Sequence, residues 1–347
     1  MTQPPPLPAR FTSRLYRLAC AVVSIFPVVI AVACWHDGTW HMDQGRGFSQ
    51  HYGYWAIFAS APLLTVLTAW LGKVFAATVR DVDGYCTNLT DETRAHLSRL
   101  VRRHLDSLGL RARSAWIFAF LVLVLLFWWL FNVVKTIMPI PTYGHDVFDA
   151  YDHPLGFYAA KTYTLLLFSL VYSVAIFVAL HVTVSLISIL RFANQHDVLR
   201  INLFHADNCA GTSRFGNINL LVLGVYGQFF FVDYAMYLTH RRPYLALVAS
   251  LTAACTLAIT QSVVAVYSIH TAVARTKRAY VEAMAIQLQA RVADSLARER
   301  PFPSDLLAIR DRLLGVHTFP YAGEALVAVN ALRFAPGALA IISYFRG

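Results

Sequence analysis

The chain has 347 residues, of which 57% are hydrophobic and only 14% are charged, and its formal net charge at pH 7 is +10. Soluble globular domains carry about 25% charged residues, so this composition excludes a soluble globular domain and indicates a membrane protein with several crossings. In such a protein, lysines and arginines are enriched in the loops that face the cytoplasm. Their excess therefore indicates the orientation of the chain, and it does not indicate nucleic acid as a partner.

Six apolar runs reach the length of about 20 residues that a helix needs to cross a bilayer. They cover residues 15–35, 54–74, 115–138, 165–190, 217–238 and 244–270. The predicted fold class is therefore all-α, with a polytopic membrane bundle of about six transmembrane helices in residues 1–270 and a helical cytoplasmic region in 271–347. The tail 321–345 is apolar but broken around Pro336, which favours a re-entrant or interfacial hairpin over a seventh crossing.

The arginines and lysines indicate the orientation of the bundle. They gather in the N-terminal tail, in the connections 75–114 and 191–216, and directly after residue 270, whereas the other three connections carry few. Because cytoplasmic loops are enriched in cations, both termini are predicted to be cytoplasmic. We expect an integral protein of a bacterial inner membrane, with the lipid bilayer as its first partner.

Two stretches outside the crossings have helical periodicity. Residues 91–108 place five apolar side chains on one stripe, with Thr90 as N-cap and several arginines on the remaining surface. This amphipathic helix either packs on another cytoplasmic helix or lies on anionic lipid. After the sixth crossing the chain is expected to stay helical to about residue 298, and a stripe from Val281 to Leu296 suits packing against a partner or a second copy.

A polar loop precedes the fifth crossing and carries the first group of candidate site residues. Histidine, aspartate and cysteine at spacing i, i+2, i+4 can bind a metal, and a glycine-containing backbone before a helix can hold an anion. The simpler alternative is a turn in which the histidine and aspartate pair with neighbours and an asparagine caps the helix. The candidate ligand or regulatory residues are His205, Asp207, Cys209, Arg214, Asn217 and Asn219.

The outward loops hold the second group, in which histidines alternate with aspartates. Imidazole and carboxylate ligands suit Zn²⁺ or a similar divalent metal. The same loops could attract cations to a pore mouth, or be ordinary solvated surface. The candidate metal ligands are His36, His41, His145, Asp149 and His153.

The third group consists of polar side chains inside the apolar runs, where each is costly. An ion path needs such groups, and so does ordinary hydrogen bonding between helices. His181 could ligate haem, but the sequence predicts no second histidine at its depth in another helix. The candidate path residues are Lys135, His181, Gln228, Asp233 and Gln261.

No hydrolase, metalloprotease or nucleotide-binding signature is present in the sequence. The leading hypothesis is a homo-oligomeric ion channel that favours cations. One alternative is a metal-dependent membrane enzyme that uses the outward histidines and aspartates. The other is a membrane sensor or scaffold that signals to a cytoplasmic protein partner.

Overall fold

The computed structural model describes residues 9–41, 48–50, 52–108, 163, 169–240, 245–298 and 304–320. Within these ranges the chain is helical and has no strand, so the all-α prediction is confirmed. An antiparallel bridge joins Cys86 to Leu199. The expected third crossing at 115–138 and the apolar tail 321–345 lie outside the described residues.

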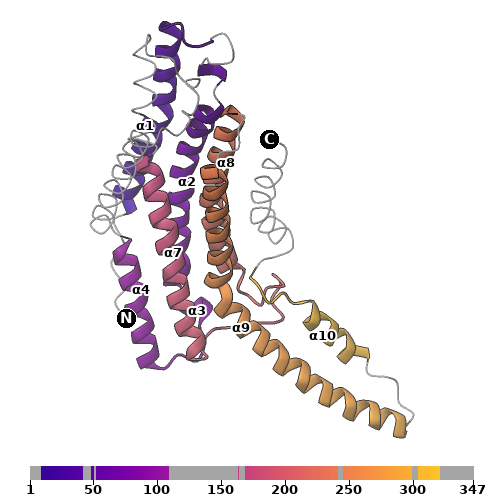
Figure 1. Cartoon of the computed structure of the whole chain (residues 1–347). Coiled ribbons are helices and arrows are strands. Elements are labelled where there is room, and N and C mark those ends of the chain that lie inside the picture. Colours follow the sequence, from indigo (N-terminus) through magenta and orange to yellow (C-terminus); the bar gives the residue numbers. More distant parts are fainter. Residues whose placement is uncertain are drawn as a thin grey trace.

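The helices are labelled in Figure 1. Several begin or end close to the limits that the hydrophobic pattern predicts, and α9 runs through the expected sixth crossing without a break. The described elements are α1 (Ala9–His36), the short 3-10 helix η2 (Phe48–Gln50), α2 (Tyr52–Arg80), α3 (Val82–Tyr85), α4 (Asp91–Ser107), α7 (Ser169–Gln195), α8 (Ser213–His240), α9 (Leu245–Arg298) and α10 (Ser304–Gly315).

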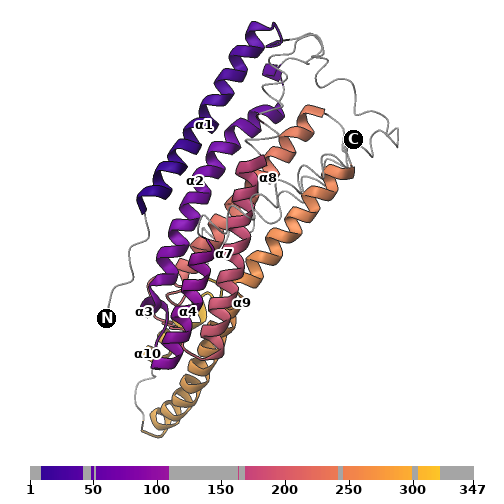
Figure 2. The same ribbon diagram turned by 90° about the vertical axis from the view of Figure 1, so that its left-hand side faces the viewer.

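Helix α2 lies at the centre of the bundle and packs against α1, α7 and α8, while α9 packs against α7 and α8. Figure 2 shows α1 and α2 running side by side, with α7, α8 and α9 to their right. Large aliphatic and aromatic side chains fill the contacts between these helices and exclude solvent. Examples that are almost fully buried are Leu64, Leu71, Phe75, Leu186, Ile189, Ile218 and Val266.

Two described helices are long and apolar enough to cross a membrane, namely α2 and the stretch Leu170–Gln195 of α7. A shorter apolar helix occupies Ala21–His36 within α1. Large apolar side chains also point outward, including Val28 (62% exposed) on α1 and Val184 (58%) on α7. These features are compatible with membrane association. Six crossings stay a prediction, because only part of the chain is described.

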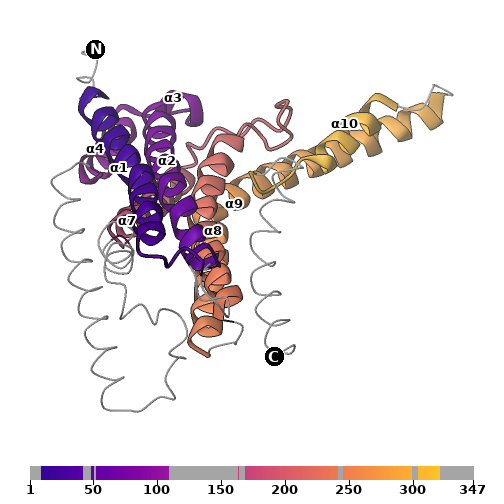
Figure 3. The ribbon, with the colours of Figure 1, turned by 90° about the horizontal axis from the view of Figure 1, so that it is seen from above.

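Helix α9 has 54 residues and is therefore about 80 Å long at the rise of an α-helix. Its first half packs in the bundle, and its second half leaves the bundle with α10 alongside it (Figures 1 and 3). The apolar stripe that begins at Val281 thus has a partner within the chain. Met284 from this stripe packs against the core cluster that also includes the buried Leu313 of α10.

Candidate functional site

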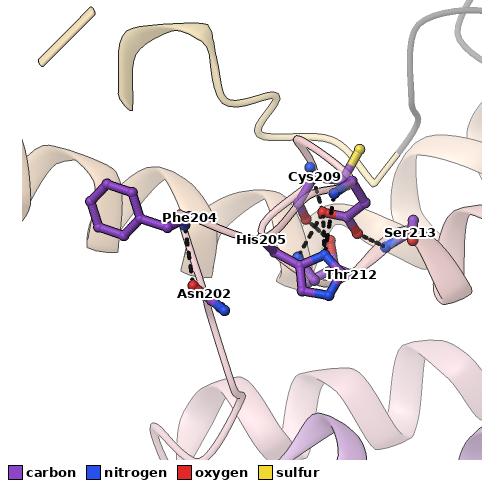
Figure 4. A network of polar contacts seen from close by, with 8 residues as sticks. Asn202, Phe204, His205, Cys209, Thr212 and Ser213 are labelled. Atoms are coloured by element: carbon purple, nitrogen blue, oxygen red, sulfur yellow. Dashed lines mark hydrogen bonds and ion pairs between the residues drawn. The ribbon is translucent and has the colours of Figure 1, made fainter. Parts of the chain in front are cut away.

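The polar loop before α8 is held together by one carboxylate. The Oδ1 atom of Asp207 accepts hydrogen bonds from the backbone N–H groups of Cys209 (2.9 Å) and Gly211 (3.1 Å). Its Oδ2 atom accepts one from the N–H of Ser213 (3.3 Å), the first residue of α8. Figure 4 shows the loop, with Cys209 and Ser213 among its labelled side chains. Asp207 therefore closes the loop onto the helix, as an N-terminal anchor does.

The histidine of the loop pairs with the same carboxylate. His205 Nδ1 lies 3.0 Å from Asp207 Oδ1, and the His205 side chain is half exposed (Figure 4). Partial burial by itself raises the pKa of Asp207, but hydrogen bonds from Cys209, Gly211, Ser213 and His205 outweigh it and lower the pKa to about 2. The carboxylate is therefore ionised and fully engaged at neutral pH.

The cysteine of the loop is buried and inert. Burial, assisted by the negative charge of Asp207, raises the pKa of the Cys209 thiol to about 11. A protonated thiol is a poor nucleophile and a poor metal ligand. Together with the engaged carboxylate, this favours the simpler interpretation of the loop as a structural turn. Helix α8 begins at Ser213, so Asn217 lies in its second turn and is exposed instead of capping it.

Arg214 joins the start of α8 to the segment around α3. Its Nη1 atom lies 3.0 Å from Asp81 Oδ2, and its Nη2 atom donates to the carbonyl oxygen of Gly84 at 2.7 Å. The ring of Tyr85 meets that of Phe215 edge-on, with centroids 5.5 Å apart. The arginine therefore positions two chain segments and leaves few donors for a ligand.

The same region is tied to α9 and α10 by two cations two residues apart. Arg275 contacts Asp197 Oδ1 at 2.6 Å and Asn194 Oδ1 at 2.8 Å, at the end of α7. Lys277 donates to the carbonyl oxygens of Leu314 (2.8 Å) and Val316 (2.9 Å), at the end of α10. These bonds satisfy carbonyl groups that a helix end leaves open. We call the region formed by residues 81–90, 196–214, 270–278 and 313–317 the junction.

A backbone contact completes the junction. The N–H of His317 donates to the carbonyl oxygen of Asn208 at 2.9 Å, so the chain after α10 touches the loop that Asp207 closes. Asn208 and Ala210 both have positive φ angles, of 53° and 57°. A left-handed backbone is costly for residues other than glycine, so the surrounding contacts must hold the loop in this shape.

Helix α4 meets α7 through two histidines and two serines. His181 Nε2 lies 3.0 Å from the carbonyl oxygen of His104 and 3.2 Å from Ser107 Oγ. Ser185 Oγ donates to the carbonyl oxygen of His181 at 2.7 Å and lies 3.0 Å from His104 Nδ1. Since the hydroxyl proton of Ser185 is used, His104 donates from Nδ1.

The surroundings of His104 favour its neutral form. Its Nε2 atom is buried and has no hydrogen-bond partner within the described part of the chain. Burial first, and then the neighbouring His181 and Arg103, lower the pKa of His104. The expectation that His181 has no histidine neighbour on another helix is wrong, because the two rings lie 5.9 Å apart.

A polar pair joins α2 to α8. Ser60 Oγ donates to Gln228 Oε1 at 3.1 Å. Asn219 of α8 is 1% exposed, and Thr68 of α2 is 3% exposed. Gln228 and Asn219, two of the predicted site residues, thus lie at the centre of the bundle but far apart along α8.

The other predicted residues are not brought together by the described structure. His36 and His41 are exposed, and no group of three or more metal-ligating side chains forms within the described ranges. Lys135, His145, Asp149 and His153 lie outside those ranges. Asp233 belongs to α8 and Gln261 to α9, but their side chains are not described.

Sequence reasoning missed Asp197, Arg275 and His104 as structural partners. Asp197 and Arg275 are separated by 78 residues, so no local pattern connects them. His104 lies on the polar margin of the amphipathic stripe, and this position was the one signal that could have singled it out. No protein-family model, curated protein or solved structure matches this chain with significance.

Proposed function

We propose that the chain is a membrane sensor or relay, which passes a change in its membrane bundle to the hairpin of α9 and α10 on the cytoplasmic side. The observation that carries this proposal is the continuity of α9, a single helix from Leu245 to Arg298. A continuous helix transmits a tilt or rotation from one end to the other, because its backbone hydrogen bonds resist local bending. A cytoplasmic protein would bind the hairpin in one of its positions and not in the other.

The proposal includes six membrane crossings. The two described candidate spans and the outward apolar side chains support it, together with the apolar runs in the undescribed ranges. The distribution of arginines supports a cytoplasmic position for both termini and for the junction. We place the protein in a bacterial inner membrane on the same grounds.

The junction supplies the coupling in this proposal. Arg275 holds the end of α7, and Lys277, half a turn further along α9, holds the end of α10. A movement of α7 that pulls on Arg275 therefore displaces the anchor of α10 as well. Coupling between distant sites needs such an element with contacts to both.

Replacing Arg275 tests the coupling. In nanodiscs, Arg275→Ala should speed amide hydrogen exchange at the end of α7 and also in α10, each by up to about fivefold, the size expected for an exposed ion pair. Arg278→Ala removes a neighbouring exposed arginine as the matched control and should change neither. Faster exchange at the end of α7 with unchanged exchange in α10 would contradict the relay.

A pore between subunits is the second candidate function. The observation that favours it is the part-buried Ser60–Gln228 pair, because polar groups persist inside membrane bundles where they bond across helices or line a path. In this proposal homo-oligomeric copies pass cations, and Lys135, Asp233 and Gln261 are further lining candidates. Cation flux into proteoliposomes that Gln228→Leu abolishes would favour the pore, and the lack of any flux would exclude it.

A further inference from the structure

Helix α4 presents an arginine face away from the bundle. Leu97 and Val101 are buried toward α7 and α2, whereas Arg99, Arg102 and Arg103 are exposed. The three arginines are spaced i, i+3, i+4, so they lie on one side of the helix. The apolar stripe of α4 thus packs on α7 and α2, and the arginines face outward.

These three arginines have no carboxylate partner among the described residues. By contrast, Arg94 on the same helix forms an ion pair with Asp83 at 2.8 Å, so its charge is neutralised within the protein. Arg99 makes one hydrogen bond, from Nε to the carbonyl oxygen of Ala95 at 3.4 Å. The face therefore carries three guanidinium groups available to an external anion.

The contacts between α4 and α7 determine where the three arginines lie along α7. Near its start, the ring of His96 stacks on Phe192 with centroids 4.8 Å apart. Near its end, His104 contacts His181. Both partners belong to the stretch of α7 that is apolar and long enough to cross a membrane. The three arginines lie between these two contacts, alongside the cytoplasmic part of that stretch.

We propose that Arg99, Arg102 and Arg103 bind the headgroups of anionic phospholipids in the cytoplasmic leaflet, and that this contact holds α4 against α7. The inference rests on the membrane placement given above and adds the partner of this helix. Basic side chains near an anionic bilayer surface are attracted to it, and guanidinium groups match phosphate geometry. The lipid composition of the leaflet would then act on the relay through α4.

Hydrogen exchange in lipid nanodiscs tests this inference on the full chain. One disc contains phosphatidylcholine only, and the other contains about one-third phosphatidylglycerol. Exchange in α4 should be slower in the anionic disc, by on the order of fivefold for each arginine engaged. The triple variant Arg99→Gln, Arg102→Gln, Arg103→Gln should exchange at the same rate in both discs.

The control variant removes three exposed arginines from α9 and α10, namely Arg278→Gln, Arg291→Gln and Arg312→Gln. It carries the same net charge as the test variant and should keep the full lipid response in α4. An unchanged rate in the wild-type chain, loss of the response in both variants, or the same slowing by inorganic phosphate in the neutral disc would overturn the inference. The Arg275→Ala experiment is independent of lipid charge, so the relay and this inference can fail separately.

Discussion

Asp207 concentrates several contacts on a single side chain, so its replacement should be costly. Asp207→Asn keeps the size but removes the charge and one acceptor oxygen for the N–H groups of Cys209, Gly211 and Ser213. We expect a loss of about 1–3 kcal/mol in the free energy of unfolding, the cost of leaving partly buried donors unsatisfied. The measurement is the thermal unfolding midpoint in detergent, with the exposed Asp106→Asn as a control that should change it little.

The same residue predicts a pH dependence. Since folding lowers the pKa of Asp207 from 3.8 to about 2, its contribution to stability is complete above pH 3.8 and is lost as the pH falls toward 2. The unfolding midpoint of the wild-type chain should fall in that window by more than that of Asp207→Asn. Equal decreases in the two chains would show that the carboxylate does not anchor the loop.

Gly84 should tolerate no larger side chain while the Asp81–Arg214 pair is intact. A Cβ atom at this position would overlap the carboxylate of Asp81 and lie 2.8 Å from Arg214 Nη1. Gly84→Ala and Asp81→Ala should therefore each cost up to about 1 kcal/mol, the value of an exposed ion pair. The double variant should cost no more than either change alone, because both remove the same contact. Additive losses in unfolding midpoint would contradict this assignment.

At the residue scale the sequence predicted local partners and missed distant ones. The pairing of His205 with Asp207 follows from a spacing of two residues and was one of the alternatives for that loop. The contact of Arg275 with Asp197 joins segments that only the packing of α7 against α9 brings together. Hydrophobic periodicity carries no information about such pairs.

Helix α4 depends on His104 for its contact with α7, and this makes the contact sensitive to pH. The pKa of His104 is lowered from 6.5 by burial first, and then by His181 and Arg103. A lowered histidine pKa stabilises the docked helix above pH 6.5, and this stabilisation is lost as the pH falls below that value. Amide exchange in α4 should then become several-fold faster.

The variant His104→Asn separates titration from packing. Asparagine keeps a donor near the position of Nδ1, so it can bond Ser185 without taking up a proton. The variant should keep α4 docked and lose the pH response. His96→Asn removes another histidine of α4 and should retain the response. A response of equal size in His104→Asn would exclude His104 as the group that titrates.

Elements with strong periodicity were predictable, and their partners were not. The capping residue and apolar stripe of residues 91–108 predict a helix because both depend on positions three or four apart. The stripe that begins at Val281 suits a second copy of the chain equally well, yet in the structure α10 packs along α9 and the stripe is partly buried. An apolar stripe indicates that another surface packs against it, but only the folded structure shows which surface that is.

For the whole molecule, composition and the apolar runs indicated a helical membrane protein. The described residues confirm an all-α chain with two helices able to cross a membrane. The relay proposal, which rests on the continuity of α9, requires the junction and the hairpin of α9 and α10 to lie on one side of that membrane. The central claim is therefore that the chain crosses the membrane with the junction facing the cytoplasm.

The most direct test uses a membrane-impermeant maleimide on intact cells. Single cysteines replace His36, whose side chain is 81% exposed, and Arg278 of α9, in a chain whose five native cysteines are changed to serine or alanine. The account predicts that His36→Cys reacts in intact cells and that Arg278→Cys reacts only after the membranes are opened. Equal labelling of both positions in intact cells, or release of the protein from membranes by alkaline carbonate, would contradict it.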